Sequence, residues 1–314
     1  MNKLLLLSAI SIMSLGILLF GCSRIGNEAI TPENDPALAM AKNTKVEADV
    51  GPSKGKAVVR IPANAMEVAK NVFFIDAKVV DGNIVEGYAF VHYKDKKGFG
   101  KPGCNNNGIC EPGEHPKKCG DCSGGSGEDP SSCYEFIANG TKWKSIESYL
   151  VDPDNTRGLD ASEISSKISE CIQKWEDAAG TDILGNEISG TVDHASIGNS
   201  INGQNEVIFA DIENDGAIAV AIVWGIFGGP PGKRELVEWD MVFDDVDFDW
   251  AMDGSPDAMD FESIATHELG HSKGMGDLYE PACSEQTMYG YATEGETKKR
   301  DLESGDIAGI KKLY

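Results

Sequence analysis

Two histidines and a glutamate in the C-terminal third of the chain have the spacing of a hydrolytic metal site. The segment reads His267-Glu268-Leu-Gly-His271. On a helix, residues four apart lie on one face, so His267 and His271 can present two imidazoles to one metal ion. Glu268 then faces a water on that ion as a general base, which is the arrangement of zinc-dependent hydrolases. The alternative is a pair of surface histidines on an ordinary helix.

A third ligand is predicted six residues after His271. Gly274 and Asp277 extend the pattern to His-Glu-x-x-His-x-x-Gly-x-x-Asp. A glycine at this place lets the helix stop and the chain turn through a conformation that is costly for other residues. The next side chain can then return to the metal, which makes Asp277 the third-ligand candidate. If the third ligand lies elsewhere, His194 is the first alternative.

The residues around the two histidines favour a helix. Asp260 can serve as its N-cap, and Glu262 suits the N-terminal end of the helix dipole. The apolar residues recur at the spacing of one helix face, at Phe261, Ile264, Ala265 and Leu269. The motif therefore lies where its geometry requires a helix.

The segment after the candidate ligands resembles a known family. Thr287-Met288-Tyr289-Gly290-Tyr291 is similar to the methionine-containing turn beneath the metal of metzincins. On this basis the chain is identified as a matrixin-like member of these metallopeptidases. The resemblance runs from Lys142 to the last residue, and it includes residues 237–243 as the strand before the active-site helix and residues 306–310 as the closing helix. The chain departs from the family at Asp277, where most matrixins carry histidine.

The resemblance implies an activity and a set of roles. The implied activity is zinc-dependent endopeptidolysis, in which Glu268 takes a proton from the attacking water and passes it to the leaving amine. Met288 is implied to be a structural floor and not a ligand. Residues 217–224 are implied to form the upper edge strand of the cleft, along which a polypeptide substrate lies as an added strand. The implied zinc ligands are His267, His271 and Asp277.

Two questions stay open from the residues alone. Tyr289 and Tyr291 are candidates for the wall of the pocket beside the scissile bond, and the alternative is that they are core aromatics. The chain as a whole is either a peptidase or a non-catalytic surface adhesion or binding lipoprotein whose zinc is structural. The intact Glu268 favours the peptidase, because a purely structural site has no use for a base beside the water.

The pattern over residues 126–314 predicts a single catalytic domain. Asp160 and Glu163 resemble a capping pair for a helix that ends near Gly180. Helix, strands, helix, turn and helix in this order fit an α+β fold of the zincin-like (metzincin) type, with a mixed sheet and an active-site helix. The predicted strands cover residues 143–151, 206–210, 217–224 and 236–243.

The N-terminus predicts export. One lysine, an apolar run over residues 4–20 and Gly21-Cys22 make residues 1–21 a signal peptide of the lipoprotein kind, with lipidation at Cys22. The alternative is an uncleaved transmembrane anchor. Lipidation would hold the mature protein by its N-terminus at the surface of a prokaryotic cell, on the outer face of the membrane. Residues 22–54 are predicted to be a flexible tether, because they lack apolar periodicity.

A small β-rich module is predicted for residues 55–100. The strand-like runs are residues 58–61, 72–80 and 85–93, and Asp-Gly-Asn at residues 81–83 is typical of a hairpin turn. His92 lies in the last run and is interpreted as a structural residue. The role of this module cannot be read from its sequence.

The next segment, residues 101–125, is rich in cysteine and ends in a glycine-rich linker. In an exported chain, the spacing favours two disulfides over a zinc site for Cys104, Cys110, Cys119 and Cys122. Ca²⁺ is a second candidate cofactor on oxygen chemistry alone, at Asn105, Asn107, Glu111 and Glu114. Occupation of the zinc by Cys104, as in the pro-segments of animal matrixins, is disfavoured because disulfide partners are near at hand.

Three more cysteines follow, at positions 133, 171 and 283. Bridging Cys283 to Cys171 would fasten the loop between the third ligand and the methionine turn to the core, and Cys133 would then be free or paired elsewhere. An acidic run is interpreted as a solvated face in preference to a calcium site, since Trp250 stands where an EF-hand loop needs glycine. The run consists of Asp244, Asp245, Asp247, Asp249 and Asp253.

The charge balance limits the partners. The chain has 51 acidic and 28 basic residues and a net charge of -23. Such a charge excludes nucleic acid as a natural partner, and it favours cationic substrates or simply solubility.

Overall fold

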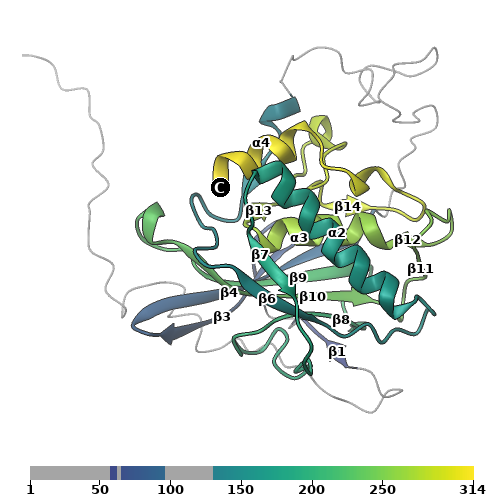
Figure 1. The fold of residues 1–314 in the computed structure, drawn as a ribbon, viewed down its shortest axis with the longest axis horizontal. Helices are drawn as coiled ribbons and strands as arrows, with labels where there is room; N and C mark the ends of the chain where they lie inside the picture. Colours follow the sequence, from purple (N-terminus) through teal and green to yellow (C-terminus); the bar gives the residue numbers. More distant parts are fainter. Residues whose placement is uncertain (1–56, 62–64, 96–129) are drawn as a thin grey trace, which may run out of the picture.

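The computed structural model describes residues 57–61, 65–95 and 130–314, and within them one large sheet dominates (Figure 1). The sheet has ten strands in this described part, in the order β2-β3-β4-β9-β10-β8-β6-β7, with β1 beside β8 and β14 beside β4. The bounds are β1 Val58–Val59, β2 Met66–Ala69, β3 Val72–Val80, β4 Asn83–Lys94, β6 Glu147–Val151, β7 Leu184–Glu187, β8 Asn205–Ile212, β9 Ala217–Ile226, β10 Glu235–Asp244 and β14 Tyr291–Ala292.

The sheet is mixed, as the sequence predicts. Strand β9 runs antiparallel to both β4 and β10, whereas β8 runs parallel to β10 and β6. Two short pairs lie outside this sheet, and they join β5 (Glu135–Phe136) to β13 (Met275–Gly276) and β11 (Trp250–Ala251) to β12 (Met259–Asp260). The predicted α+β class is confirmed.

Three helices lie on one side of the sheet: α2 (Ala161–Ala179), α3 (Phe261–Ser272) and α4 (Ser304–Leu313) (Figure 1). Helix α2 begins where predicted, because the Asp160 side chain accepts hydrogen bonds from the amides of Ser162 and Glu163. It ends at Gly180, which has a left-handed backbone. Helix α3 has Asp260 as its N-cap, also as predicted.

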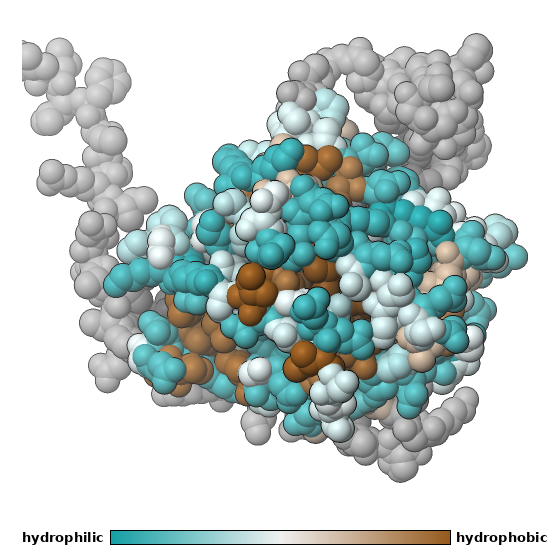
Figure 2. Space-filling view, viewed as in Figure 1, coloured by the Kyte–Doolittle hydropathy of each residue, from teal (hydrophilic) through white to brown (hydrophobic). Residues whose placement is uncertain are grey.

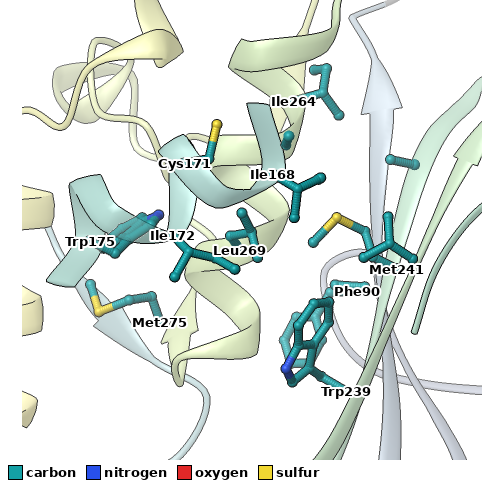
Figure 3. Close-up of a cluster of buried hydrophobic side chains, with 14 of the residues drawn as sticks. Phe90, Ile168, Cys171, Ile172, Trp175, Trp239, Met241, Ile264, Leu269 and Met275 are labelled. Carbon is teal, nitrogen blue, oxygen red and sulfur yellow. The ribbon is translucent and has the colours of Figure 1, made fainter. Parts of the chain in front are cut away.

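The larger of two hydrophobic core clusters among the described residues lies between these helices and the sheet (Figure 3). Ile168 and Ile172 of α2 and Leu269 of α3 pack there with Trp239 and Met241 of β10. Every residue of α3 is buried. The helix that carries the metal motif is therefore central to the domain, with α2 packed against it and the sheet beneath it.

Residues 57–61 and 65–95 do not form a module separate from the domain that follows. Strand β4 pairs with β9 and so extends the large sheet, and β3 and β2 follow outside it. The physical reason is the composition of the hairpin, since buried apolar residues lie on both faces of β4 and can be shielded from water only within a larger sheet. The predicted turn is confirmed, because Asp81 and Gly82 have positive φ angles of 50° and 79°.

The hairpin keeps apolar surface on its outer side. Val68 of β2 and Val79 and Val80 of β3 are exposed. The space-filling view is otherwise mostly hydrophilic, and apolar residues gather on it where these outer strands lie (Figure 2). Among the described residues, none of the helices is both long enough and apolar enough to cross a membrane. The predicted signal peptide, tether and cysteine-rich segment lie outside the described residues.

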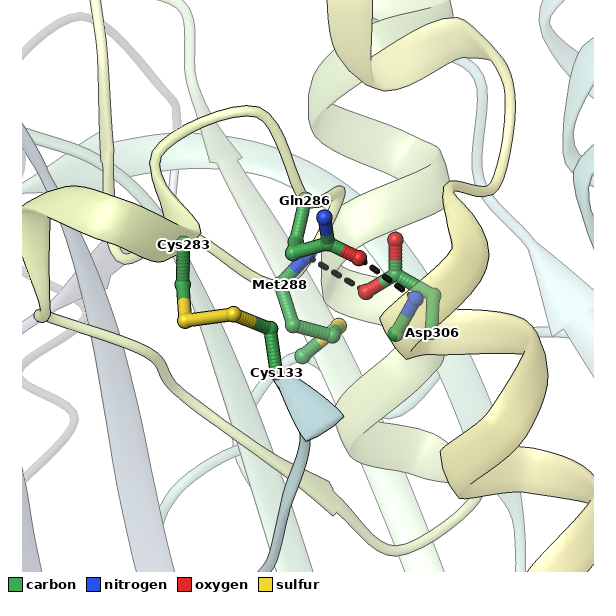
Figure 4. The surroundings of a disulfide bond; sticks show 6 residues. Cys133, Cys283, Gln286, Met288 and Asp306 are labelled. Carbon is green, nitrogen blue, oxygen red and sulfur yellow. Dashed lines mark hydrogen bonds between the residues drawn. A yellow bond between two sulfur atoms is a disulfide. The ribbon is translucent and has the colours of Figure 1, made fainter. Parts of the chain in front are cut away.

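A disulfide corrects the predicted cysteine pairing (Figure 4). Cys283 is bonded to Cys133 and not to Cys171, which is buried as a free thiol. Cys171 points toward α3, where its sulfur accepts a hydrogen bond from the Thr266 hydroxyl at 3.1 Å. The Cys171 thiol therefore faces α3. Cys133 stands just before β5, whose partner β13 follows the metal helix.

The disulfide is expected to stabilise the domain. Cys283→Ala opens a crosslink between residues 150 positions apart, and it should lower the free energy of unfolding by about 3–5 kcal/mol. Cys171→Ala makes the same change at a free thiol and should cost only about 1 kcal/mol. Urea denaturation of both variants under non-reducing conditions measures the difference. Equal losses would mean that the crosslink contributes nothing.

Candidate metal centre

His267 and His271 both keep their Nε2 atoms available for a metal. The Nδ1 atom of His267 lies 2.7 Å from the Thr287 carbonyl oxygen, and that of His271 lies 2.9 Å from the Met275 carbonyl oxygen. A carbonyl can only accept, so each Nδ1 carries the proton and each Nε2 keeps its lone pair. Such outer hydrogen bonds orient histidine ligands in metal sites.

Asp277 completes the set of ligand atoms. Its Oδ1 lies 3.2 Å from His267 Nε2 and 3.5 Å from His271 Nε2. In a tetrahedral zinc site with bonds of about 2.0–2.1 Å, two ligand atoms lie about 3.3 Å apart. His267 Nε2 and Asp277 Oδ1 are buried, and neither has a hydrogen-bond partner among the described residues. The donor set, spacing and burial therefore fit a zinc ion, and Asp277 lies where the sequence predicts the third ligand.

Gly274 lets the chain turn back after α3, so that Asp277 can reach the two histidines. Its φ is +96°, in the left-handed region that favours glycine. A Cβ at this position would also lie 2.7 Å from the Thr141 carbonyl oxygen. The chain leaves α3 through this residue and forms β13 before it reaches Asp277. The predicted turn at Gly274 is confirmed.

A buried methionine turn lies beneath the helix (Figure 4). Met288 is fully buried, and its sulfur lies so near Gly270 that a Cβ there would overlap it. The carboxylate of Asp306, on α4, accepts hydrogen bonds from the amides of Thr287 and Met288 at 2.8 and 3.2 Å. Asp306 thus fixes the turn whose Thr287 carbonyl orients His267. The sequence offered no signal for this role of Asp306.

Glu268 lies beside the ligands in a fully buried position. Its Oε1 is 3.1 Å from His92 Nδ1, and its Oε2 has no hydrogen-bond partner among the described residues. Burial raises the pKa of this carboxyl to about 8. A carboxyl with a pKa near neutrality can both accept and return a proton.

The electrostatics of the ligands depend on Asp277. Burial alone would raise its pKa, but the two imidazoles hold that pKa well below its usual range. Burial lowers the pKa of His267 to about 4. For His271, burial alone would lower the pKa, but the Asp277 carboxylate, together with Glu268 and the Met275 carbonyl, raises it. A proton on this imidazole competes with a metal ion for its Nε2.

Two residues that sequence analysis did not assign to the site belong to it. His92, interpreted as structural, comes from β4 and lies with its ring centre 4.0 Å from that of His267. Tyr279 donates its hydroxyl proton to Asp277 Oδ2 at 3.1 Å and thereby orients the third ligand. The sequence signal for His92 was its position in an apolar strand, because a buried histidine needs a hydrogen-bond partner. Which residue is that partner depends on how the strands of the sheet pair.

The two candidate pocket tyrosines are half-buried beside the centre. Tyr291 is the first residue of β14, and its ring lies 5.6 Å from that of Tyr279. The Lys70 ammonium lies over both rings, 4.1 Å from the centre of Tyr279 and 4.8 Å from that of Tyr291. Tyr289 packs against the core, and its carbonyl accepts a hydrogen bond from buried Lys299. The pocket role of Tyr289 and Tyr291 stays a prediction.

The remaining sequence candidates lie elsewhere. His194 pairs with Asp152 at 2.7 Å and is not part of the ligand cluster, so it is not the third ligand. The acidic run is not uniformly a solvated face, because Asp244 and Asp245 are buried. Asp244 accepts hydrogen bonds from the amides of Val246 and Asp247, so this part of the run is structural.

Replacement of Asp277 tests the third ligand. Asp277→Ala should weaken zinc binding at least about 100-fold, because one of three ligand atoms is lost and His267 and His271 keep their positions. Asp277→His should recover most of the affinity, provided that the longer side chain fits after Gly274. Competition titration against a chromophoric chelator measures both. Parent-like affinity of Asp277→Ala would place the third ligand elsewhere.

Comparison of the sequence with known proteins identifies a matching family and several similar proteins. The sequence profile of the family described as matrixin matches residues 142–314. Metalloendoproteinase 2-MMP of Arabidopsis thaliana is 30% identical over 175 residues, which cover 53% of this chain and 40% of that protein. Human matrilysin is 43% identical over 70 residues, which cover 22% of this chain and 25% of that protein. The chain thus spans less than half the length of these curated relatives.

Proposed function

Since this chain belongs to the matrixin family, we propose that it is a zinc-dependent endopeptidase that hydrolyses peptide bonds in extracellular proteins. The observation that carries the proposal is the place of Glu268, a buried carboxylate beside three convergent ligand atoms. A purely structural metal site has no use for such a base. This favours the peptidase over a surface-binding protein with a structural zinc.

The residues of the site divide the chemistry between them. His267, His271 and Asp277 would hold a zinc ion, which would supply Lewis-acid polarisation of a water and of the scissile carbonyl. Glu268 accepts a proton from the attacking water at its carboxylate, and the raised pKa lets it hand this proton to the leaving amine. The carbonyls of Thr287 and Met275 keep both imidazoles in the tautomer that leaves Nε2 free.

The neighbouring backbone suits an extended peptide. A peptide that adds as a strand to a sheet edge is held through its main chain, so many sequences are accepted. Strand β9 runs beside α3, and β14 follows the methionine turn; in the described form β4 pairs with both strands. The expectation that β9 is an open edge strand is therefore wrong for this form of the chain, since β10 pairs with its other side. Tyr291 begins β14, and its ring lies 5.6 Å from that of Tyr279, which donates a hydrogen bond to Asp277; this supports its predicted place beside the scissile bond.

Replacement of the base separates catalysis from metal binding. Glu268→Gln should keep one zinc per chain, because the three ligands are intact, and should lower hydrolysis of an unstructured protein such as casein at least about 1,000-fold. Glu262→Gln makes the same change on the same helix away from the ligands and should leave hydrolysis within about threefold. Near-parental hydrolysis by Glu268→Gln would rule out its role as the base.

We propose further that the protein is anchored to the outer face of a membrane through acylated Cys22. The support is the sequence alone: an apolar run over residues 4–20, a small residue and then cysteine. Such an anchor would present the metal centre to extracellular polypeptides. The segment lies outside the described residues.

Cys22→Ser tests the anchor. The variant should appear in the soluble fraction of expressing cells, because acyl chains supply the anchoring free energy and the rest of the chain is acidic. Fractionation followed by immunoblotting measures the distribution, with Cys171→Ser as the control that must stay with the membrane. Membrane retention of Cys22→Ser would instead indicate an uncleaved transmembrane anchor.

A further inference from the structure

Asp277 differs from the two histidines in the number of atoms that it can offer a metal ion. Each imidazole has one free nitrogen, because its Nδ1 donates to a backbone carbonyl. A carboxylate has two oxygens and can bind a cation through one of them or through both. With two imidazoles and both carboxylate oxygens, four protein atoms would surround the ion. A catalytic zinc site instead needs one coordination position that no protein atom fills.

The two oxygens of Asp277 lie in different surroundings. Oδ1 faces the imidazoles, 3.2 Å from His267 Nε2 and 3.5 Å from His271 Nε2, and it has no hydrogen-bond partner among the described residues. Oδ2 accepts a hydrogen bond from the Tyr279 hydroxyl at 3.1 Å. The side chain of Asp277 is only 4% exposed, so solvent offers Oδ2 little alternative to this hydroxyl. One oxygen is therefore presented to the metal position, and the other is held by a tyrosine.

The Tyr279 hydroxyl has one proton and two acceptors within reach. The second acceptor is the backbone carbonyl oxygen of Lys70, also at 3.1 Å. A phenol donates a single hydrogen bond, and a carboxylate is the stronger acceptor because of its charge. Lys70 is exposed, so water can serve its carbonyl instead. The proton of Tyr279 is therefore directed to Asp277 Oδ2.

Three contacts hold the Tyr279 ring in this place. The Lys70 ammonium lies 4.1 Å from the centre of this ring, at a distance typical of a cation–π contact. The Tyr291 ring packs edge-on against it with centres 5.6 Å apart. Gly290 leaves room for the ring, because a Cβ at that position would lie 2.5 Å from it. Lys70 precedes the region that the family profile matches, so the profile does not include this support.

We propose that Tyr279 is a positioning residue that makes Asp277 a ligand through Oδ1 alone. By holding Oδ2, its hydroxyl keeps the second oxygen away from the metal and so preserves the coordination position that the attacking water needs. The two histidines require no such partner, because each offers a single nitrogen. This inference rests on the proposed peptidase function, but the number of bound oxygens can be measured without catalysis.

Two roles of the hydroxyl make opposite predictions for metal affinity. If the hydroxyl only orients Asp277, its loss should weaken zinc binding, because the third ligand is then less well placed. If the hydroxyl holds Oδ2 back, its loss should let both oxygens bind, and the affinity should stay the same or rise. The direction of the change therefore separates a general structural contribution from the proposed one.

Tyr279→Phe tests the proposal, because it removes the hydroxyl and keeps the ring. Crystal structures of the full-length, zinc-loaded parent and variant measure the distance of each Asp277 oxygen from the ion. In the parent, Oδ1 alone should lie at a bonding distance of about 2.0–2.2 Å, and in the variant both oxygens should bind. Competition titration against a chromophoric chelator should show a zinc affinity that is unchanged or higher in the variant.

Hydrolysis of casein adds a kinetic readout. Tyr279→Phe should lower kcat at least about tenfold and leave KM within about twofold, because the position for water is lost while the contacts with substrate persist. Tyr134→Phe is the matched control. It removes a tyrosine hydroxyl that accepts a hydrogen bond from Lys312 at 2.8 Å, away from the ligands, and it should change none of these quantities.

The possible results separate the proposal from the proposed activity. Weaker zinc binding by Tyr279→Phe, with Asp277 still bound through Oδ1 alone, would overturn the proposal and leave Tyr279 as an orienting residue only. A parent in which both oxygens bind zinc would overturn it as well. If both oxygens bind in the variant alone and neither protein hydrolyses casein, the role of Tyr279 is supported and the peptidase activity is overturned instead.

Discussion

Three lone pairs converge in the interior of this domain, and the rest of the structure depends on holding them there. The Nε2 atoms of His267 and His271 face Asp277 Oδ1 at 3.2 and 3.5 Å, and all three side chains are almost completely buried. These three atoms present lone pairs to one another, so their approach favours a cation between them, whether a metal ion or the proton that the raised pKa of His271 favours. The arrangement is thus preorganised for a metal. Holding these groups together costs folding free energy, which the surrounding contacts must offset.

The surrounding contacts come from four separate parts of the chain. Two backbone carbonyls fix the imidazoles, and one of them belongs to the methionine turn. Asp306 of α4 holds the amides of that turn, and the Cys133–Cys283 bond ties the loop before it to the start of the domain. Each contact orients a group that already touches a ligand. This is how an active site is kept within a few tenths of an ångström of its working geometry.

The same sheet that supports the site also brings a strand from outside the family domain to it. A strand edge next to a catalytic helix is useful because any extended peptide can pair with it, and it is a liability for the same reason. In this chain the edge of β9 is covered by β4, whose His92 reaches the base. The segment that precedes the family domain therefore contributes a side chain, His92, to the surroundings of the candidate metal centre.

The sequence alone determined the parts of this protein that depend on local spacing. Helix geometry involves only a few neighbouring residues, so it can be predicted from local sequence. It accounts for the four-residue spacing of His267 and His271, the glycine that ends the helix, and the caps of α2 and α3. The main strands and the α+β class followed from periodicity. These features carry the candidate metal centre because its three candidate ligands lie within eleven consecutive residues.

Tertiary structure alone decided which distant segments meet. Cys283 pairs with Cys133, while Cys171 faces Thr266 of α3 as a buried free thiol. His92 faces Glu268, 176 residues away, because β4 adds to β9 in one particular register. Strand pairing is set by the fit of two faces and two edges that no local pattern encodes, so a histidine in an apolar strand could be assigned to the active site only after the sheet was known.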